Sequence, residues 1–340
     1  MSRLDEKLSR IRSGQYRRSD FIIADAKDGD MGSGITTGGP RYNAEGKQIA
    51  WKTRRDYLDQ ITAVVRQDIV DIMLTSASNL EVLRAEGVYE GSAVKPAIRA
   101  NDATDCWGGV RGASYAAELS RPFRTANLSH VMHGKADAAP GSRITGTDLG
   151  LYSITFNNDL DADMRSLDAF AAFRAEAGRL GFSYFLEVFN PNAPQGLSPE
   201  AVPGFLNDCL LRCLSGLTQA ERPRFLKIPF NGRAAIEELA AYDPSVVIGV
   251  LGGGAGTTRD TFELLFQSEQ AGARLALFGR KINLAEAPLT LLQFMRNVAI
   301  GEIAPAEAVR AYHGELDKAG IRPRRALAAD LEITEAVLRG

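Results

Sequence analysis

Eight short apolar segments, separated by stretches with helical spacing, constrain the fold of this chain more than any other feature. The segments are rich in β-branched and aromatic residues, which favour strands. They cover Phe21–Asp25, Ile69–Thr75, Val94–Arg99, Leu149–Phe156, Ser183–Phe189, Arg224–Pro229, Val246–Leu251 and Arg274–Phe278. Strands that alternate with helices indicate parallel strands joined by crossover connections.

Eight such units predict a single-domain α/β fold, the (β/α)8 TIM barrel, whose active sites lie at the carboxyl ends of the strands. A doubly wound open sheet is the alternative, but no GxGxxG follows the first strand and the glycines cluster near the last two. We expect an N-terminal helix or arm over residues 1–20 and the barrel over 21–303. Residues 304–340 are expected to form a helical extension of the same domain, either closing the bottom of the barrel or joining an oligomer interface.

Two connections are longer than ordinary loops. Lys27–Trp51 follows the first strand, and Asn101–Thr147 lies between the third and fourth. Long insertions of this kind often cover an active site or make subunit contacts, and we expect a homo-oligomer.

Charge and composition exclude several classes of protein. The 340 residues hold 40 basic and 42 acidic side chains, a formal net charge of -2, which argues against a general nucleic-acid binder. No run of about 18 apolar residues could span a membrane, and no apolar export signal begins the chain. The three cysteines, Cys106, Cys209 and Cys213, form no CxxC pair. We therefore expect a cytoplasmic protein.

Histidine is scarce, which argues against a transition-metal site. His130, His133 and His313 are the three in the chain, and the first two could supply only half of a site. We expect no metal and no cofactor.

Lys227 lies within an apolar strand. Because strand side chains alternate, Leu226 and Ile228 suit the helix-covered outside of a barrel, and Lys227 then points into its interior. Burial favours the neutral form of an amine, which can attack a carbonyl. A structural lysine, or one that binds phosphate, is the other interpretation.

Glu187 occupies the equivalent place one strand earlier, between the aromatic residues Phe185 and Phe189. A carboxyl group in such surroundings holds its proton more tightly and suits acid–base catalysis near neutral pH. It could also be the counter-ion of Lys227, and the two roles are compatible.

The first strand ends in a group of charged residues. Asp25 continues the face of Ile23 and is the acidic side chain that we expect to point inward. Lys27, Asp28 and Asp30 fall in the following loop, where solvation is the simpler interpretation.

Glycine-rich turns follow the last two strands. Gly252, Gly253 and Gly254 lead toward a helix whose N-terminus would favour an anion, and Gly279-Arg280 ends the eighth strand. Barrels often bind phosphate with the loops after these two strands. We expect one phosphate pocket there.

Together, Phe225-Leu226-Lys227-Ile228, the glycine run and Gly279-Arg280-Lys281-Ile282 resemble the class I, Schiff-base aldolase superfamily. The resemblance spans roughly residues 182–283 and includes tagatose-1,6-bisphosphate, sulfofructose-phosphate and archaeal-type fructose-bisphosphate aldolases. It implies that Lys227 is the Schiff-base lysine, that Asp25 is the first-strand aspartate, and that the glycine turns hold the phosphate of a sugar substrate.

The fourth and fifth strands bear on the branch within that superfamily. Glu187 resembles the acid–base glutamate of the tagatose-bisphosphate and sulfofructose-phosphate branch. Archaeal-type enzymes carry a fourth-strand tyrosine, but Tyr152 is out of register and the expected position falls near Thr155 or Phe156. Ser153 and Thr155 are further candidates on this strand. Arg99, Asp102 and Asp105, near the third strand, either contact substrate or form a surface network.

The expected reaction is metal-independent aldol cleavage or formation in a phosphorylated ketose. A transaldolase, an acyl-transferring relative or a decarboxylating lyase could use the same lysine. A phosphosugar-binding protein without turnover is the non-catalytic alternative.

Overall fold

The computed structural model describes residues 2–43, 46–139 and 141–339. Eight parallel strands close into a barrel, and neighbouring strands pair in the circular order β1, β4, β5, β8, β9, β10, β11 and β12. Their bounds are Ile22–Lys27, Ile72–Thr75, Lys95–Arg99, Leu149–Thr155, Ser183–Phe189, Leu226–Ile228, Ile248–Leu251 and Leu275–Phe278. Each lies in or overlaps one of the predicted segments, so the predicted barrel is confirmed.

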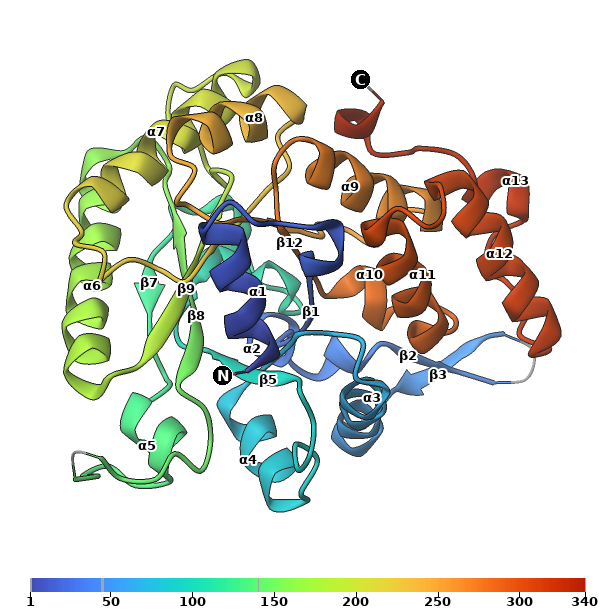
Figure 1. The fold of residues 1–340 in the computed structure, drawn as a ribbon, viewed down its shortest axis with the longest axis horizontal. Coiled ribbons are helices and arrows are strands. Elements are labelled where there is room, and N and C mark those ends of the chain that lie inside the picture. Colours follow the sequence, from blue (N-terminus) through green and yellow to red (C-terminus); the bar gives the residue numbers. More distant parts are fainter. Residues whose placement is uncertain (1, 44–45, 140, 340) are drawn as a thin grey trace.

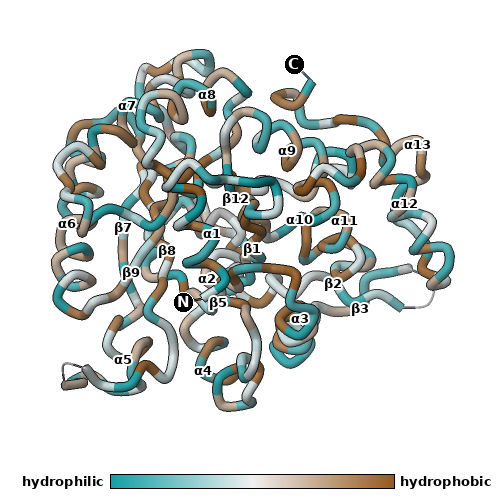
Figure 2. Tube along the Cα trace, in the orientation of Figure 1, coloured by the Kyte–Doolittle hydropathy of each residue, from teal (hydrophilic) through white to brown (hydrophobic). Residues whose placement is uncertain are grey.

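Helices surround the strands (Figure 1). Those that follow barrel strands or close the ring are α3 Arg54–Gln67, α4 Ala77–Ala85, α6 Leu160–Leu180, α7 Val202–Ser215, α8 Arg233–Tyr242, α9 Thr258–Gln270 and α11 Pro288–Ile300. Side chains at helical spacing, such as Phe170, Phe173 and Ala177 of α6, are buried against the strands. The alternation of hydrophilic and hydrophobic colour along these helices in Figure 2 reflects their one-sided burial.

Strand alternation sorts the buried side chains into two clusters. The inner cluster fills the barrel and includes Ile22, Leu74, Phe185 and Leu275. The outer cluster lies between strands and helices and includes Ile23. Two buried faces explain why the strands read as continuous apolar runs.

The amino end of the barrel is closed by α1, Arg3–Arg12. Its Leu4 and Leu8, one turn apart, belong to the inner cluster, and α1 lies across the centre of the barrel in Figure 1. Ser2 begins the helix with a capping box, in which the Ser2 hydroxyl accepts from the Asp5 backbone amide and the Asp5 carboxylate accepts from the Ser2 backbone amide.

The C-terminal extension lies elsewhere than at the bottom. It contains α12 Pro305–Lys318 and α13 Leu327–Asp330. Tyr312 and Leu316 are buried as their spacing predicts. Two hydrogen bonds join the extension to α9: the Thr334 hydroxyl donates to the Asp260 carboxylate, and the Thr258 amide donates to the Asp330 carboxylate. Of the two roles expected for this segment, closing the barrel is performed by α1, and the role in an oligomer interface stays a prediction.

Both insertions start at the carboxyl end of the barrel. The first holds α2 Asp30–Ser33 and an antiparallel hairpin of β2 Pro40–Tyr42 and β3 Gln48–Trp51. The second holds a small pair, β6 Asp102–Ala103 with β7 Pro122–Phe123, and α5 Leu128–His133. They meet at Gly109, where a Cβ atom would lie 2.3 Å from the Ser33 Oγ. Glycine at this position lets the two insertions pack.

Candidate active site

Lys227 and Glu187 are brought together inside the barrel, as predicted. They are register partners on β10 and β9, and their outward neighbours Leu226, Ile228 and Leu186 belong to the outer cluster. The Lys227 Nζ lies 2.5 Å from Glu187 Oε1, and the residues are 6% and 1% exposed. A buried ion pair of this kind excludes solvent from an amine and a carboxylate that can exchange a proton.

Glu187 is held by two further donors. The Ser153 hydroxyl, on the register partner in β8, donates to its Oε2 at 2.7 Å, and an Arg99 Nη2 lies 3.3 Å from the same oxygen. Three groups thus fix the carboxylate in one orientation. Ser153 and Arg99, candidates from the sequence, both lie in the site.

Arg99 extends the site toward two more carboxylates. Its Nε donates to Asp28 Oδ2 at 2.5 Å, its Nη1 donates to Ser153 at 3.0 Å, and the same Nη1 lies 3.6 Å from Asp102 Oδ1. All of these side chains are buried. The result is a continuous chain of charges from Asp28 and Asp102 through Arg99 and Glu187 to Lys227.

Asp25 does not face the barrel interior, and that prediction is wrong. Its register partners, Met73 and Phe278, lie in the outer cluster, whereas Ala24 pairs with Leu277 in the inner one. Asp25 instead pairs with Lys27, whose Nζ lies 3.0 Å from Asp25 Oδ1. Both side chains are buried outside the barrel, so Lys27 is also removed from the site.

Asp28 is the first-strand carboxylate that reaches the site, although the sequence suggested a solvated loop residue. It lies one residue beyond β1 and is 6% exposed. Burial alone would raise its pKa, but the positive charges of Arg99 and Lys227 outweigh burial and hold the pKa below the usual range.

Asp102 has the opposite electrostatic character. Burial raises its pKa to about 7; Arg99 opposes the rise, and the nearby carboxylates of Asp28 and Glu187 add to it. Asp28 and Asp102, which both contact Arg99, thus have pKa values shifted in opposite directions. Such a difference is typical of sites that carry out acid–base chemistry.

The fourth barrel strand, β8, directs polar side chains toward the site, but its tyrosine is not among them. Thr155 donates a hydrogen bond to Asp105 Oδ2 at 2.8 Å, which links the strand to the second insertion. Tyr152 points outward and stacks on Phe173 with ring centroids 4.4 Å apart. Phe156 is buried in the same outer cluster.

The glycine turns lie at the same end of the barrel as Lys227. A Cβ atom on Gly252 would come within 3.0 Å of the Phe278 ring, and one on Gly279 within 2.8 Å of the Ala26 carbonyl oxygen. Gly253 has a φ of +64°, and Gly254 is exposed. The close contacts at Gly252 and Gly279 and the positive φ of Gly253 explain why glycine occurs in these turns. The exposed Gly254 leaves backbone accessible to a ligand.

Two helices begin near these glycine turns. At the N-terminus of α9, the amides of Thr257 and Thr258 already donate to Asp260 and Asp330. The short helix α10, Arg280–Asn283, begins directly after Gly279, and its Arg280 is exposed. The exposed Arg280 is therefore a side chain that an anion at these turns could contact.

The histidines and cysteines lie apart from these residues. His130 and His133 lie on α5, and His313 is 2.9 Å from Asp330. Cys209 and Cys213 are buried free thiols on α7; the side chain of Cys106 lies outside the described residues. Among the described side chains, no group of three or more potential metal ligands comes together. None of the described helices is long and apolar enough to cross a membrane.

The fold matches solved aldolase structures. An archaeal fructose 1,6-bisphosphate aldolase superposes with a TM-score of 0.60 at 15% identity, over 88% of this chain and 99% of that one. A second archaeal aldolase structure, with its catalytic lysine bound to a carbinolamine intermediate, gives 0.59 and 15%, over 88% and 100%. A Corynebacterium glutamicum protein gives 0.57 and 18%, over 88% and 98%. No protein-family model matches the chain, and no curated protein matches it in sequence.

Proposed function

We propose that this protein is a class I aldolase that cleaves or forms a C–C bond in a phosphorylated ketose through a Schiff base on Lys227. The observation that carries the proposal is the buried contact of 2.5 Å between Lys227 and Glu187 on adjacent strands. The archaeal aldolase that carries a lysine-bound carbinolamine has the same fold, which supports the choice of reaction.

The contacts suggest how the proton moves. Glu187 accepts a proton from Lys227, and the neutral amine attacks the substrate ketone to form a carbinolamine. Glu187 returns its proton so that the carbinolamine hydroxyl leaves as water, and a protonated imine remains. The imine then draws the electron pair of the C–C bond as Glu187 accepts the proton of the sugar hydroxyl. The bond breaks to an enamine and an aldehyde.

Other residues have supporting roles in this proposal. Arg99 and Ser153 orient Glu187, and Asp28 holds Arg99 in place. Gly252, Gly253, Gly254, Gly279 and Arg280 bind the substrate phosphate.

Borohydride trapping tests the proposal directly. Wild type and Lys227→Arg are incubated with dihydroxyacetone phosphate or ketose phosphates, reduced, and mapped by peptide mass. Arginine keeps a positive charge beside Glu187 but forms no imine, so it is the matched control. We expect an adduct on Lys227 of the wild type and none on the buried lysines Lys27 and Lys281. If these ligands bind but no adduct forms, the aldolase proposal is wrong and the protein is a phosphosugar-binding protein without turnover.

The cellular setting belongs to the same proposal. We place the protein in the cytoplasm, where free thiols such as those of Cys209 and Cys213 stay reduced.

We also propose a homo-oligomer, because Ile35 and Ile49 of the first insertion are 70% and 60% exposed.

A further inference from the structure

A large cavity lies at the amino end of the barrel, opposite the candidate active site. It has a volume of about 640 Å³, within the range of small-molecule sites. It is bounded by the start of β9, the start of β10 and the loops that precede β10 and β11. The glycine turns and Lys227 do not line it.

Arginines dominate the charge of this cavity. Arg12 comes from the end of α1, Arg174 from α6, and Arg222 and Arg224 from the loop before β10. Among the described lining residues, Glu221 is the only carboxylate. Four arginines from three parts of the chain therefore line one space.

Three of these arginines have acidic partners. Arg174 pairs with Glu221 at 3.2 Å, Arg222 with Asp243 at 2.9 Å, and Arg224 with Asp5 at 2.6 Å. These pairs fix the guanidinium groups in place while leaving some of their N–H groups for a ligand.

Arg12 differs from the other three. Its Nη2 donates to the carbonyl oxygen of Arg224 at 2.6 Å, and no ion pair is recorded for it among the described residues. Burial, and then the charge of Arg224, lower its pKa. An anion between these two guanidinium groups would relieve their repulsion.

The floor of the cavity is apolar and aromatic. Phe182, Tyr184 and Phe225 line it, and all three are buried. The Tyr184 hydroxyl donates to the Glu221 carbonyl oxygen at 2.7 Å, and the Glu221 side chain accepts from the Thr218 hydroxyl at 2.9 Å. The loop that carries two of the arginines is therefore held in place without a ligand.

We infer that this cavity binds a small organic anion that carries at least two negative charges and a flat apolar body. The guanidinium groups recognise the charge through charge-assisted hydrogen bonds, and the aromatic floor covers the apolar part. The inference does not depend on the aldolase reaction, because it uses none of the residues proposed for it.

Calorimetric titration with phenyl phosphate tests the inference, because this probe combines a dianion with a ring. We expect one site per chain, with phenyl phosphate binding more tightly than inorganic phosphate and with phenol giving no measurable binding. Arg12→Gln removes one charge-assisted contact and should weaken phenyl phosphate about tenfold or more. Gln219→Glu places a negative charge in the cavity lining without removing any arginine, and should weaken it as well.

Two controls separate this cavity from other sites. Arg55→Gln removes an exposed arginine that pairs with Glu86 outside the cavity, and should leave binding unchanged. Unchanged thermal unfolding of Arg12→Gln and Gln219→Glu would show that both fold. The inference is overturned if millimolar phenyl phosphate does not bind. It is also overturned if binding survives both cavity variants, or is lost only in Arg280→Gln, which would place the probe at the glycine turns.

Discussion

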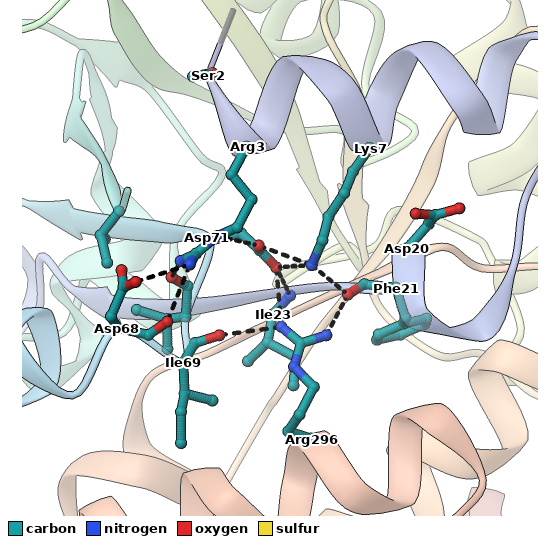
Figure 3. Close-up of polar contacts among 12 residues, drawn as sticks. Ser2, Arg3, Lys7, Asp20, Phe21, Ile23, Asp68, Ile69, Asp71 and Arg296 are labelled. Atoms are coloured by element: carbon teal, nitrogen blue, oxygen red, sulfur yellow. Dashed lines mark hydrogen bonds and ion pairs between the residues drawn. The ribbon is translucent and has the colours of Figure 1, made fainter. Parts of the chain in front are cut away.

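The two ends of the barrel each bury a network of charges, but they balance them differently. At the amino end, a single carboxylate, Asp71, lies among three cations from α1 and α11 (Figure 3). At the carboxyl end, Asp28, Asp102 and Glu187 share Arg99 and Lys227. The amino-end network therefore has more cations than carboxylates, and the carboxyl-end network has more carboxylates than cations.

The amino-end network surrounds its one carboxylate closely with cations. Asp71 Oδ1 lies 2.8 Å from Lys7 and 3.0 Å from Arg3, while Oδ2 accepts from Arg296 and from the backbone amide of Ile23, each at 3.0 Å. Its role is to attach α1 and α11 to the base of β1 and β4. A carboxylate with a cation within 3.0 Å of each oxygen is suited to stability.

The carboxyl-end network leaves one oxygen poorly matched. Asp102 Oδ1 has Arg99 at 3.6 Å and accepts no hydrogen bond within the described part of the chain. The comparison teaches that buried charge alone does not identify a catalytic site. The network whose carboxyl groups have pKa values shifted in opposite directions is the one suited to acid–base chemistry.

The largest effect is expected from Glu187→Gln. The amide keeps the shape of the side chain but cannot accept the proton of Lys227, so turnover of the best ketose phosphate should fall about a hundredfold to ten-thousandfold. Steady-state kinetics measures the loss, and circular dichroism checks the fold. Turnover within threefold of wild type would remove Glu187 from the acid–base role.

Asp71→Ala should give the complementary result. Loss of the carboxylate leaves three buried or half-buried cations without their partner, which should cost about 3–5 kcal/mol of unfolding free energy. Urea denaturation measures the loss. Activity per folded molecule should stay unchanged; a specific loss of turnover would mean that the two ends are coupled.

Asp102→Asn should change how stability depends on pH. A carboxyl group whose folded pKa is about 7, against an ordinary value of 3.8, keeps its proton in the folded state after the unfolded state has lost it. Wild-type stability relative to the variant should therefore fall by up to about 1.4 kcal/mol per pH unit between pH 4 and 7, and then level off. Urea denaturation of both proteins at several pH values measures this change. If the difference in unfolding free energy between them stays constant from pH 4 to 7, the pKa of Asp102 is not raised.

Lys7→Met should show a smaller effect of opposite sign at the other end. Burial, together with Arg296 and Arg3, lowers the Lys7 pKa to about 8 against the attraction of Asp71. Between pH 8 and 10.5 the unfolded state then binds more protons, so wild-type stability should rise relative to the variant by up to about 1.4 kcal/mol per pH unit. Thermal unfolding in this range, with Lys318→Met as an exposed control, measures the difference.

Particular residues explain where sequence reasoning succeeded. The strands of Lys227 and Glu187 each place one charged side chain among apolar neighbours, so the inward face is marked. In the first strand, Ile22, Ile23 and Ala24 are all apolar, and both faces of a barrel strand are buried. Alternation there could not decide which side faces inward, and Asp25 was assigned to the wrong one.

Asp102 and α1 show the limits set by tertiary structure. Asp102 lies in the second insertion, and only its packing against Arg99 gives it a role in the site. The spacing of Leu4 and Leu8 does mark a buried helical face, but no local signal tells that this face closes the barrel.

The helix that closes the barrel has a consequence for synthesis of the chain. Leu4 and Leu8 are synthesised nearly three hundred residues before the Arg296 that completes their anchoring network. At roughly 5–20 residues per second, this interval lasts roughly 15 to 60 s. During that time the apolar face of α1 lacks the barrel residues that bury it, so this face is available to a chaperone that holds nascent chains.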